Sequence, residues 1–178
     1  GDGGTLESFS DPHGNPVWDP CWLGPGTIAW GNLRGAEAAV WTLDLASRKV
    51  ASLPGSEGMM GPKCAPDGRV LAARAWSQGY WLYLPQAGRW EELGQPSNLW
   101  YPTWARDGRT LYGLSLDERA IYRFRVGQPG REKVADLGTV QPTAPWLDAW
   151  MGLDPDDAPL VLRSGGLSDL FVLDYAAR

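Results

Sequence analysis

The chain has 178 residues, a length that suits one domain able to bury roughly 70% of the surface that its unfolded form exposes. Its 16 Lys and Arg against 21 Asp and Glu leave a net charge of −5, so we expect no nucleic-acid partner, because a phosphate backbone attracts a basic surface. No apolar run is long enough to cross a bilayer, so we also expect no membrane span.

The first residues, GDGG, contain no Met, and we interpret the chain as a processed form or a piece of something longer. Its composition is unusual in having 11 Trp, 23 Gly and 15 Pro. Such a composition favours many short strands, many turns and aromatic side chains wedged between layers. We therefore expect an all-β protein.

The first predicted strand, TLESF at 5–9, has no neighbouring strand in the sequence with which to pair. A unit at 17–53 follows, with a GPG turn, an aromatic run AVWTLDL at 39–45 and a shorter polar run VASL at 50–53. Large side chains recur at every second position of the aromatic run, which is the period of a strand. This unit is predicted to form four antiparallel strands.

Two further units, at 60–93 and 100–137, repeat the same order of elements. Their first turns lie in two closely similar phrases, CAPDGRVLAA and WARDGRTLYG. Asp-Gly between two β runs is typical of a tight hairpin, because glycine accepts the positive φ that such a turn needs. A fourth unit at 150–175 keeps the strand pattern but has DPDD at the turn.

Two columns of large residues recur with the spacing of these units. Units of about 40 residues with four strands bury their faces by stacking radially, which predicts a β-propeller. We predict a single domain, 1–178, with four blades, in which strand 5–9 completes the last blade; the alternative is half of an eight-bladed ring formed by a homodimer. The second column is expected to pack between blades. The columns are Trp22, Cys64, Trp104 and Leu153, then Trp41, Trp81, Tyr122 and Phe171.

The repeated hairpin phrase resembles the WD40-like repeat of TolB-type β-propellers. The matching residues are Pro66, Asp67, Gly68, Arg69 and Leu71, and then Asp107, Gly108, Arg109 and Leu111. The last unit is similar to the terminal blade of propellers attached to bacterial transcriptional regulators and serine/threonine kinases. This resemblance implies a propeller used for binding, sensing or scaffolding. The first and last units depart from the motif, because neither has the Asp-Gly turn.

Catalytic and metal-binding patterns are weak in this sequence. The chain has one histidine, His13, and no GxSxG motif for a triad. Two loops gather acidic residues without calcium-loop spacing or a second histidine. We predict no catalytic residue, no metal and no cofactor. Acidic residues at turns are expected to accept hydrogen bonds from nearby backbone, as at Asp11, Asp19, Asp67, Asp107, Asp154, Asp156 and Asp157.

The two cysteines, Cys21 and Cys64, are too few for a disulfide scaffold and form no CxxC pair. They leave the compartment open between cytoplasm and periplasm. When the repeats are aligned, Cys21 and Cys64 fall one position apart, so their side chains lie on opposite faces of neighbouring blades. They would therefore point either toward each other or apart. We expect two buried free thiols.

The candidate binding residues lie in loops. In a propeller, the loops that enter the first strand of each blade emerge on the same side as those that join its second and third strands. In this chain, these loops are rich in Trp, Met and Arg, whereas the opposite loops carry plain turns. Trp, Tyr and Arg are frequent anchors of interaction surfaces. The candidates are Trp18, Trp76, Trp100, Tyr101, Arg119, Trp146 and Trp150.

The leading hypothesis is a non-catalytic propeller that binds, senses or scaffolds, with a protein, a peptide or a small polar ligand on this surface. One alternative is a hydrolase or lyase that uses carboxylates near the channel mouth, with Asp117, Glu118 and Asp148 beside Arg119. The other is a purely architectural ring fragment.

Overall fold

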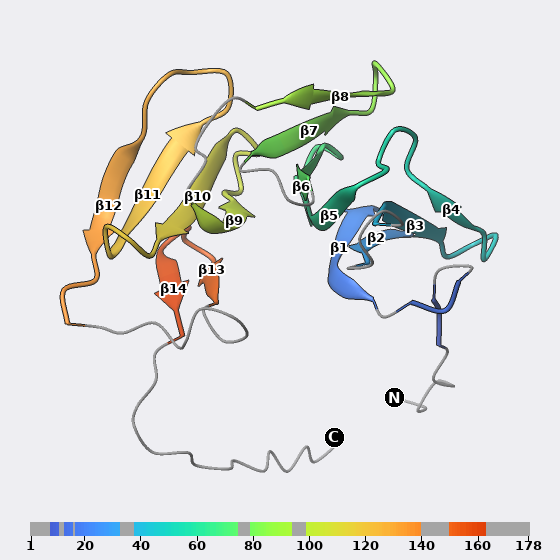
Figure 1. Ribbon diagram of the computed structural model, residues 1–178, viewed down its shortest axis with the longest axis horizontal. Helices are drawn as coiled ribbons and strands as arrows, with labels where there is room; N and C mark the ends of the chain where they lie inside the picture. Colours follow the sequence, from blue (N-terminus) through green and yellow to red (C-terminus); the bar gives the residue numbers. More distant parts are fainter. Residues whose placement is uncertain are drawn as a thin grey trace, which may run out of the picture.

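The computed structural model describes residues 8–10, 13–15, 17–32, 38–74, 79–93, 99–139 and 150–162. The regular secondary structure within these ranges consists of β-strands alone. The strands form four separate antiparallel sheets. The sheets, which we refer to as blades 1 to 4, follow one another along an arc (Figure 1). Within these ranges there is no helix able to cross a membrane. The predicted all-β propeller architecture is confirmed.

The first three blades each contain four strands in chain order. Blade 1 consists of β1 (Trp18–Gly24), β2 (Thr27–Gly31), β3 (Val40–Asp44) and β4 (Val50–Ser52). Blade 2 consists of β5 (Met59–Cys64), β6 (Val70–Arg74), β7 (Tyr80–Leu84) and β8 (Arg89–Glu92). Blade 3 consists of β9 (Trp100–Trp104), β10 (Thr110–Ser115), β11 (Ala120–Arg125) and β12 (Glu132–Asp136).

Blade 4 is described as one hairpin, β13 (Met151–Leu153) and β14 (Pro159–Val161). Its two predicted later strands, and residues 5–7 of the predicted closing strand, lie outside the described residues. Ser8 and Phe9 are described and are not in a strand, so the predicted strand is absent at these two positions. Closure of a four-bladed ring within one chain therefore stays a prediction.

The first strand of each blade lies on the inner side of the arc. β1 contacts β5, β5 contacts β9 and β9 contacts β13, whereas β4, β8 and β12 lie at the outer edge (Figure 1). The first strands of successive blades therefore lie side by side on the inner side of the molecule.

Each blade turns one set of side chains toward the blade before it, and we refer to this set as its leading face. Directly paired residues of antiparallel strands share a face, so strand register defines the set. The sets are Trp22, Ile28, Trp30, Trp41 and Leu43 in blade 1; Cys64, Val70, Ala72, Trp81 and Tyr83 in blade 2; and Trp104, Leu111, Gly113, Tyr122 and Phe124 in blade 3.

The opposite, trailing face of each blade packs on the leading face of the next. Between blades 1 and 2, Ala29 and Val40 pack with Val70, and Trp81 lies against the same cluster. Between blades 2 and 3, Leu71 and Leu82 pack with Leu111, Tyr122 and Phe124. Burial of one such side chain contributes about 1.5–3 kcal/mol. The predicted packing between blades is confirmed for Trp81 and Tyr122. It is wrong for Trp41, which belongs to none of these clusters because no described blade precedes blade 1. Phe171 lies outside the described residues.

The hairpin aspartates stabilise their turns. Asp107 Oδ1 accepts hydrogen bonds from the backbone N–H groups of Arg109 and Thr110, at 2.7 and 2.8 Å. Gly108 has a φ of 61°, as the turn requires. In blade 4, Asp154 Oδ1 accepts from the N–H groups of Asp156 and Ala158 in the same manner. These aspartates are turn residues.

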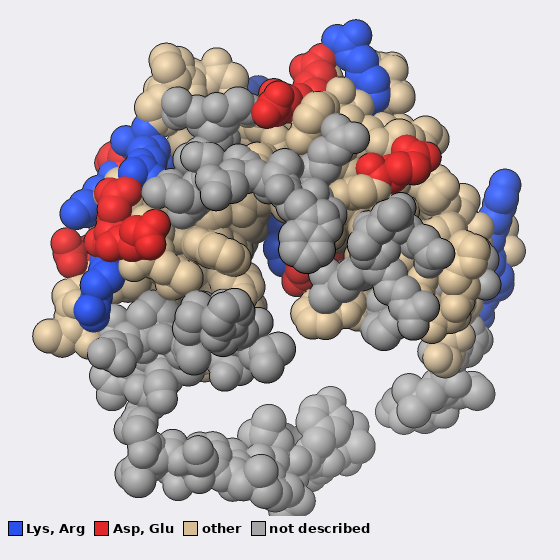
Figure 2. Space-filling view, in the orientation of Figure 1, with Lys and Arg blue, Asp and Glu red and all other residues tan. Residues whose placement is uncertain are grey.

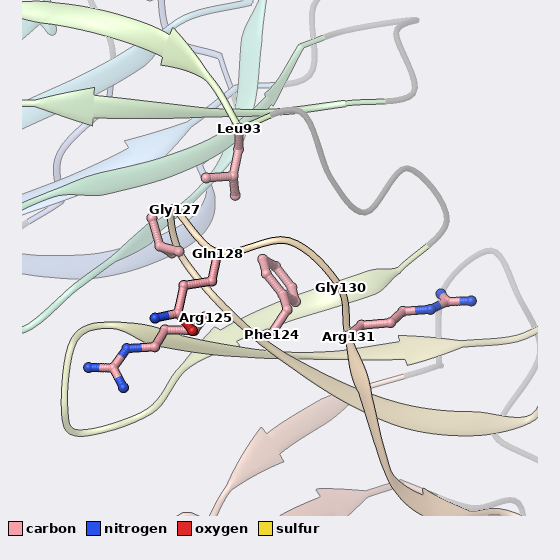
Figure 3. Close-up of a pocket in the computed structure, with 8 residues that line it drawn as sticks. Leu93, Phe124, Arg125, Gly127, Gln128, Gly130 and Arg131 are labelled. Atoms are coloured by element: carbon pink, nitrogen blue, oxygen red, sulfur yellow. The ribbon is translucent and has the colours of Figure 1, made fainter.

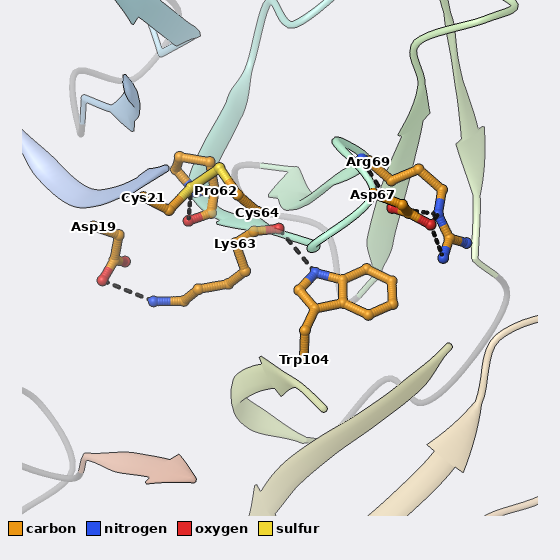
Figure 4. Close-up of a disulfide and its surroundings, with 8 residues drawn as sticks. All are labelled: Asp19, Cys21, Pro62, Lys63, Cys64, Asp67, Arg69 and Trp104. Atoms are coloured by element: carbon orange, nitrogen blue, oxygen red, sulfur yellow. Dashed lines mark hydrogen bonds and ion pairs between the residues drawn. A yellow bond between two sulfur atoms is a disulfide. The ribbon is translucent and has the colours of Figure 1, made fainter. Parts of the chain in front are cut away.

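Cys21 and Cys64 form a disulfide between β1 and β5, with their Cα atoms 5.6 Å apart (Figure 4). The prediction of two free thiols was therefore wrong. Cys21 lies on the trailing face of blade 1 and Cys64 on the leading face of blade 2. Because neighbouring blades meet through opposite faces, residues of different strand parity are the ones that face each other.

Candidate functional site

A large side chain, exposed in three blades and half-buried in blade 2, stands at the start of each inner strand. Trp18, Met60 and Trp100 hold equivalent places, because their partners in the second strands, Gly31, Ala73 and Leu114, are equivalent in the repeat. Trp150 holds this place in blade 4, where its carbonyl accepts a hydrogen bond from the N–H of Leu162 at 3.1 Å. We refer to Trp18, Met60, Trp100 and Trp150 as the inner row.

The three tryptophans of the inner row are well exposed. Their exposed fractions are 43% for Trp18, 51% for Trp100 and 51% for Trp150, and Met60 is half-buried. Large aromatic side chains normally gain stability from burial, and aromatic side chains left at the surface are typical of interaction sites. Three of the predicted binding residues, Trp18, Trp100 and Trp150, thus hold the same position in their blades, and all three are exposed.

A β-bulge directly follows the inner row in blades 1 to 3. Asp19, Gly61 and Tyr101 have φ values of 47°, 58° and 53°, and each precedes a proline. Strand register shifts by one residue at each of these places. A bulge bends its strand and redirects the adjoining side chains. For a residue as bulky as tyrosine, the left-handed conformation costs about 1–2 kcal/mol.

Sequence reasoning missed this bulge, although its signal is visible. The triplets WDP, MGP and WYP recur at the spacing of the blades. Blade 4 has WMG instead, and its hairpin is paired without a register shift. There the indole of Trp150 lies against Gly152, where an added Cβ would come within 2.5 Å of the ring. Gly152 therefore provides the space for this ring.

An ion pair lies beside the inner row. Asp19 Oδ1 and Lys63 Nζ are 2.9 Å apart and join the inner strands of blades 1 and 2 (Figure 4). The carbonyl of Lys63 accepts a hydrogen bond from Trp104 Nε1 at 3.0 Å, which joins blade 3 to the same strand. A hollow opens near the middle of the view in Figure 2, with a basic and an acidic side chain visible at its edge. The inner surface thus offers polar groups next to indoles.

Tyr101 is half-buried and lies against the cluster between blades 3 and 4. Its carbonyl accepts a hydrogen bond from Thr103 Oγ1 at 3.2 Å. Nearby, the hydroxyl of Tyr80 donates to the carbonyl of Leu99 at 2.5 Å. Burial, and to a lesser degree the neighbouring Tyr101, raise the pKa of Tyr80. Tyr80 is therefore a neutral donor that holds Leu99, the residue directly before β9, in place.

Arg119 lies in the turn between β10 and β11, with a φ of 50°. Its carbonyl accepts a hydrogen bond from the N–H of Leu137 at 2.8 Å, which ties the turn to the end of β12. The carboxylate of Glu118 is bound by the Tyr122 hydroxyl and the Arg131 guanidinium, and these two contacts lower the pKa of Glu118. Glu118 is therefore an ion-paired carboxylate rather than a proton donor near neutral pH.

The remaining candidates are dispersed or lie outside the described residues. The residues outside the described part are Trp76, Trp146 and Asp148. His13 lies edge-on to Trp41, with ring centroids 6.4 Å apart. No group of three His, Cys, Asp or Glu side chains able to hold a metal occurs in the described part of the chain.

A crevice on the outer side of the arc lies between β8 and the turn that follows β11 (Figure 3). Leu93 points toward this turn, while Arg125 and Arg131 point away from each other. Its volume of about 20 Å³ suits one water molecule. In the wider concavity beside it, Arg123 is already paired with Glu132 at 2.9 Å. This region is a weaker candidate than the inner row.

No protein family profile matches the sequence, and no curated protein matches it. Solved structures do. TolB from Acinetobacter baumannii is similar with a TM-score of 0.63 and 17% identity, over 86% of this chain and 39% of TolB. Virginiamycin B lyase from Staphylococcus aureus is similar with a TM-score of 0.55 and 13% identity, over 83% of this chain and 48% of the lyase.

A chain of a nidogen/laminin complex is similar with a TM-score of 0.57 and 10% identity, over 83% of this chain and 55% of that chain. This chain therefore spans between about two fifths and just over half of the proteins compared. At such low identity the similarity concerns the fold alone. The repeated four-stranded blades and these neighbours show that the chain has a TolB-like β-propeller fold.

Proposed function

We propose that the chain is a non-catalytic binding propeller whose inner row and its flanking groups hold a segment of protein or peptide. The observation that carries this proposal is the repeated exposure of a large side chain at the start of the inner strands. Tryptophan contributes a large contact area with few rotatable bonds, so it binds at a low cost in conformational entropy.

The surroundings of the inner row suit a peptide better than a purely apolar ligand. Asp19, which follows Trp18 in the sequence, supplies a charged acceptor, and Lys63, which is paired with it, supplies a charged donor. A peptide offers carbonyl and N–H groups to such a pair and side chains to the indoles. The nidogen/laminin structure is a protein complex that contains a propeller of this fold, which fits this class of partner.

A sensory role fits the same surface. The last repeat resembles propellers attached to bacterial transcriptional regulators and serine/threonine kinases, in which a ligand-binding propeller would report to an effector domain. The hydrolase or lyase alternative has less support, because Glu118 is engaged by Tyr122 and Arg131. The fold shared with virginiamycin B lyase does not carry its chemistry over to this chain.

The proposal is tested by selecting binders from a displayed library of random peptides against the wild-type chain. Binding of the selected peptides is then measured for Trp18→Ala and Trp100→Ala. Each substitution is expected to weaken binding at least about tenfold, because aromatic anchors of an interface commonly contribute that much. The matched control is Val134→Ala, which removes an exposed apolar side chain from the outer strand β12.

Far-ultraviolet circular dichroism and thermal unfolding of both variants should match the wild type, since both tryptophans are exposed. If selected peptides bind both variants and the Val134 control with equal affinity, the inner row is not the binding surface.

A further inference from the structure

The leading face of blade 1 has the composition of an interface that is only partly covered. Trp30 and Leu43 are 3% and 2% exposed, and Ser8 and Phe9 line one cavity with them. None of the three hydrophobic clusters among the described residues includes one of its side chains. Trp22 is 63% exposed. Its equivalents in blades 2 and 3 are both engaged by the preceding blade: Cys64 is disulfide-bonded to Cys21, and Trp104 is buried and donates to the carbonyl of Lys63. Trp22 is therefore exposed at a position that the fold normally buries.

A cavity of about 340 Å³ opens on this face. The indole of Trp30 is 3% exposed, and its Nε1–H has no hydrogen-bond partner. An unpaired buried donor costs about 1–3 kcal/mol. Elsewhere an indole donates across a blade boundary, as from Trp90 to the carbonyl of Pro54 at 3.0 Å. The lining residues are Ser8, Phe9, Val17, Pro20, Ile28, Trp30 and Leu43.

The other end of the arc carries the matching surface. Leu160 pairs with Gly152, and this places it at the position held by Ala29, Leu71 and Tyr112 in the other blades. Those three side chains are buried under the following blade, whereas Leu160 is 45% exposed. Leu162, on the same side of the hairpin, is 50% exposed. The trailing face of blade 4 is thus apolar and uncovered among the described residues.

We propose that the trailing face of blade 4 docks on the leading face of blade 1 in a second copy of this chain. The two surfaces are related in the same way as the faces that join blades 1 to 2 and 2 to 3. They lie at opposite ends of the arc (Figure 1).

Two arcs joined head to tail around a twofold axis would cover both pairs of ends and close a ring. In that ring, blade 4 of the second copy would cover Trp22, as the preceding blade covers the equivalent Trp104 within one chain. The inner rows of both copies would line one channel. This assembly goes beyond the proposed function, because peptide binding by the inner row does not require it.

Mass measurement by light scattering after size exclusion tests the assembly. The wild type is expected to have the mass of a dimer. Trp22→Glu and Leu160→Glu each place a charge on one end face, so each variant alone is expected to be monomeric, with self-association weakened at least about tenfold. Both side chains are exposed, so circular dichroism spectra should not change. Val134→Glu, on the outer edge, is the matched control and should remain dimeric.

Mixing the two variants gives the sharpest test. A Trp22→Glu chain keeps an intact trailing face and a Leu160→Glu chain keeps an intact leading face, so the mixture can form one of the two contacts. A heterodimer in the mixture is therefore expected, although each variant alone is monomeric. A monomeric wild type at all concentrations, as in a ring closed within one chain, would overturn the proposal, as would open polymers or a dimer that neither variant affects. Peptide binding by a monomer would leave the proposed function standing.

Discussion

At the scale of single residues, the fit between blades depends on side-chain volume at equivalent positions. Trp30, Ala72 and Gly113 hold the same place on the leading faces of blades 1, 2 and 3. A Cβ added at Gly113 would lie 2.7 Å from the Cβ of Leu99. The space available there is therefore set by Leu99, and it admits no side chain unless Leu99 shifts.

Gly113→Ala is expected to lower the free energy of unfolding by about 1–3 kcal/mol, because the added methyl overpacks a tight contact. Urea denaturation followed by tryptophan fluorescence measures the change. Gly79→Ala is the matched control, since the nearest atom to its added Cβ is Glu92 Oε1 at 3.7 Å. Equal stability of the two variants would show that Leu99 moves aside without cost.

Asp107 offers a second test at the residue scale. Burial raises its pKa, but hydrogen bonds from Arg109 and Thr110 outweigh this effect, and the pKa is lowered overall. Asp107→Ala is expected to reduce stability by about 1–2 kcal/mol at neutral pH, as for the loss of a capping carboxylate. Because the pKa of Asp107 is lower in the folded chain, its ionised carboxylate contributes its full stabilisation above the ordinary Asp pKa of about 4. This stabilisation is lost as the pH falls through the pKa of the folded state.

The stability difference between the wild type and Asp107→Ala should therefore shrink in acid. Urea denaturation at neutral pH and at successively lower pH measures it. A difference that stays constant down to the acid limit of folding would mean that the turn does not depend on the ionised carboxylate.

At the scale of elements, the inner strands β1 and β5 are joined more firmly than the other neighbours. The Cys21–Cys64 disulfide and the Asp19–Lys63 ion pair both connect them. The ion pair is exposed and contributes little stability in water. The disulfide closes a loop with a sequence separation of 43 and dominates this connection. Disulfides of this kind persist in oxidising environments.

Replacement of both Cys21 and Cys64 by Ser is expected to lower the free energy of unfolding by about 2–4 kcal/mol, because the unfolded chain regains loop entropy. Urea denaturation of the wild type and the double variant measures the change, and a reducing agent should affect only the wild type. Thiol titration of the denatured, unreduced wild type should find no free thiol. Two titratable thiols would contradict the bond.

At the scale of the whole molecule, stability comes from contacts between successive blades, and binding is expected where the inner strands begin. Each internal boundary repeats one arrangement, in which the trailing face of one blade covers the leading face of the next. At the ends of the arc, Trp22 of blade 1 and Leu160 of blade 4 hold positions on the same faces but are exposed. The peptide-binding and assembly experiments above address these two surfaces separately, because the inner row and the end faces share only Trp150, whose ring lies against Gly152.

Much of the architecture follows from the sequence alone. The spacing of Trp41, Trp81 and Tyr122 predicts the third strands, and the Asp-Gly turns of blades 2 and 3 predict their first hairpins. These features are local, since strand period and turn chemistry depend on residues that are close in sequence. Exposure of Trp18, Trp100 and Trp150 agrees with their place at the start of inner strands.

Only the tertiary structure decided which faces meet. It joined Cys21 to Cys64 and buried Trp104 while leaving Trp22 exposed. Trp22 and Trp104 occupy the same position of the repeat, so no local pattern separates them. The difference arises because burial depends on whether another blade stands in front of the residue, and that neighbour comes from distant sequence or from another chain.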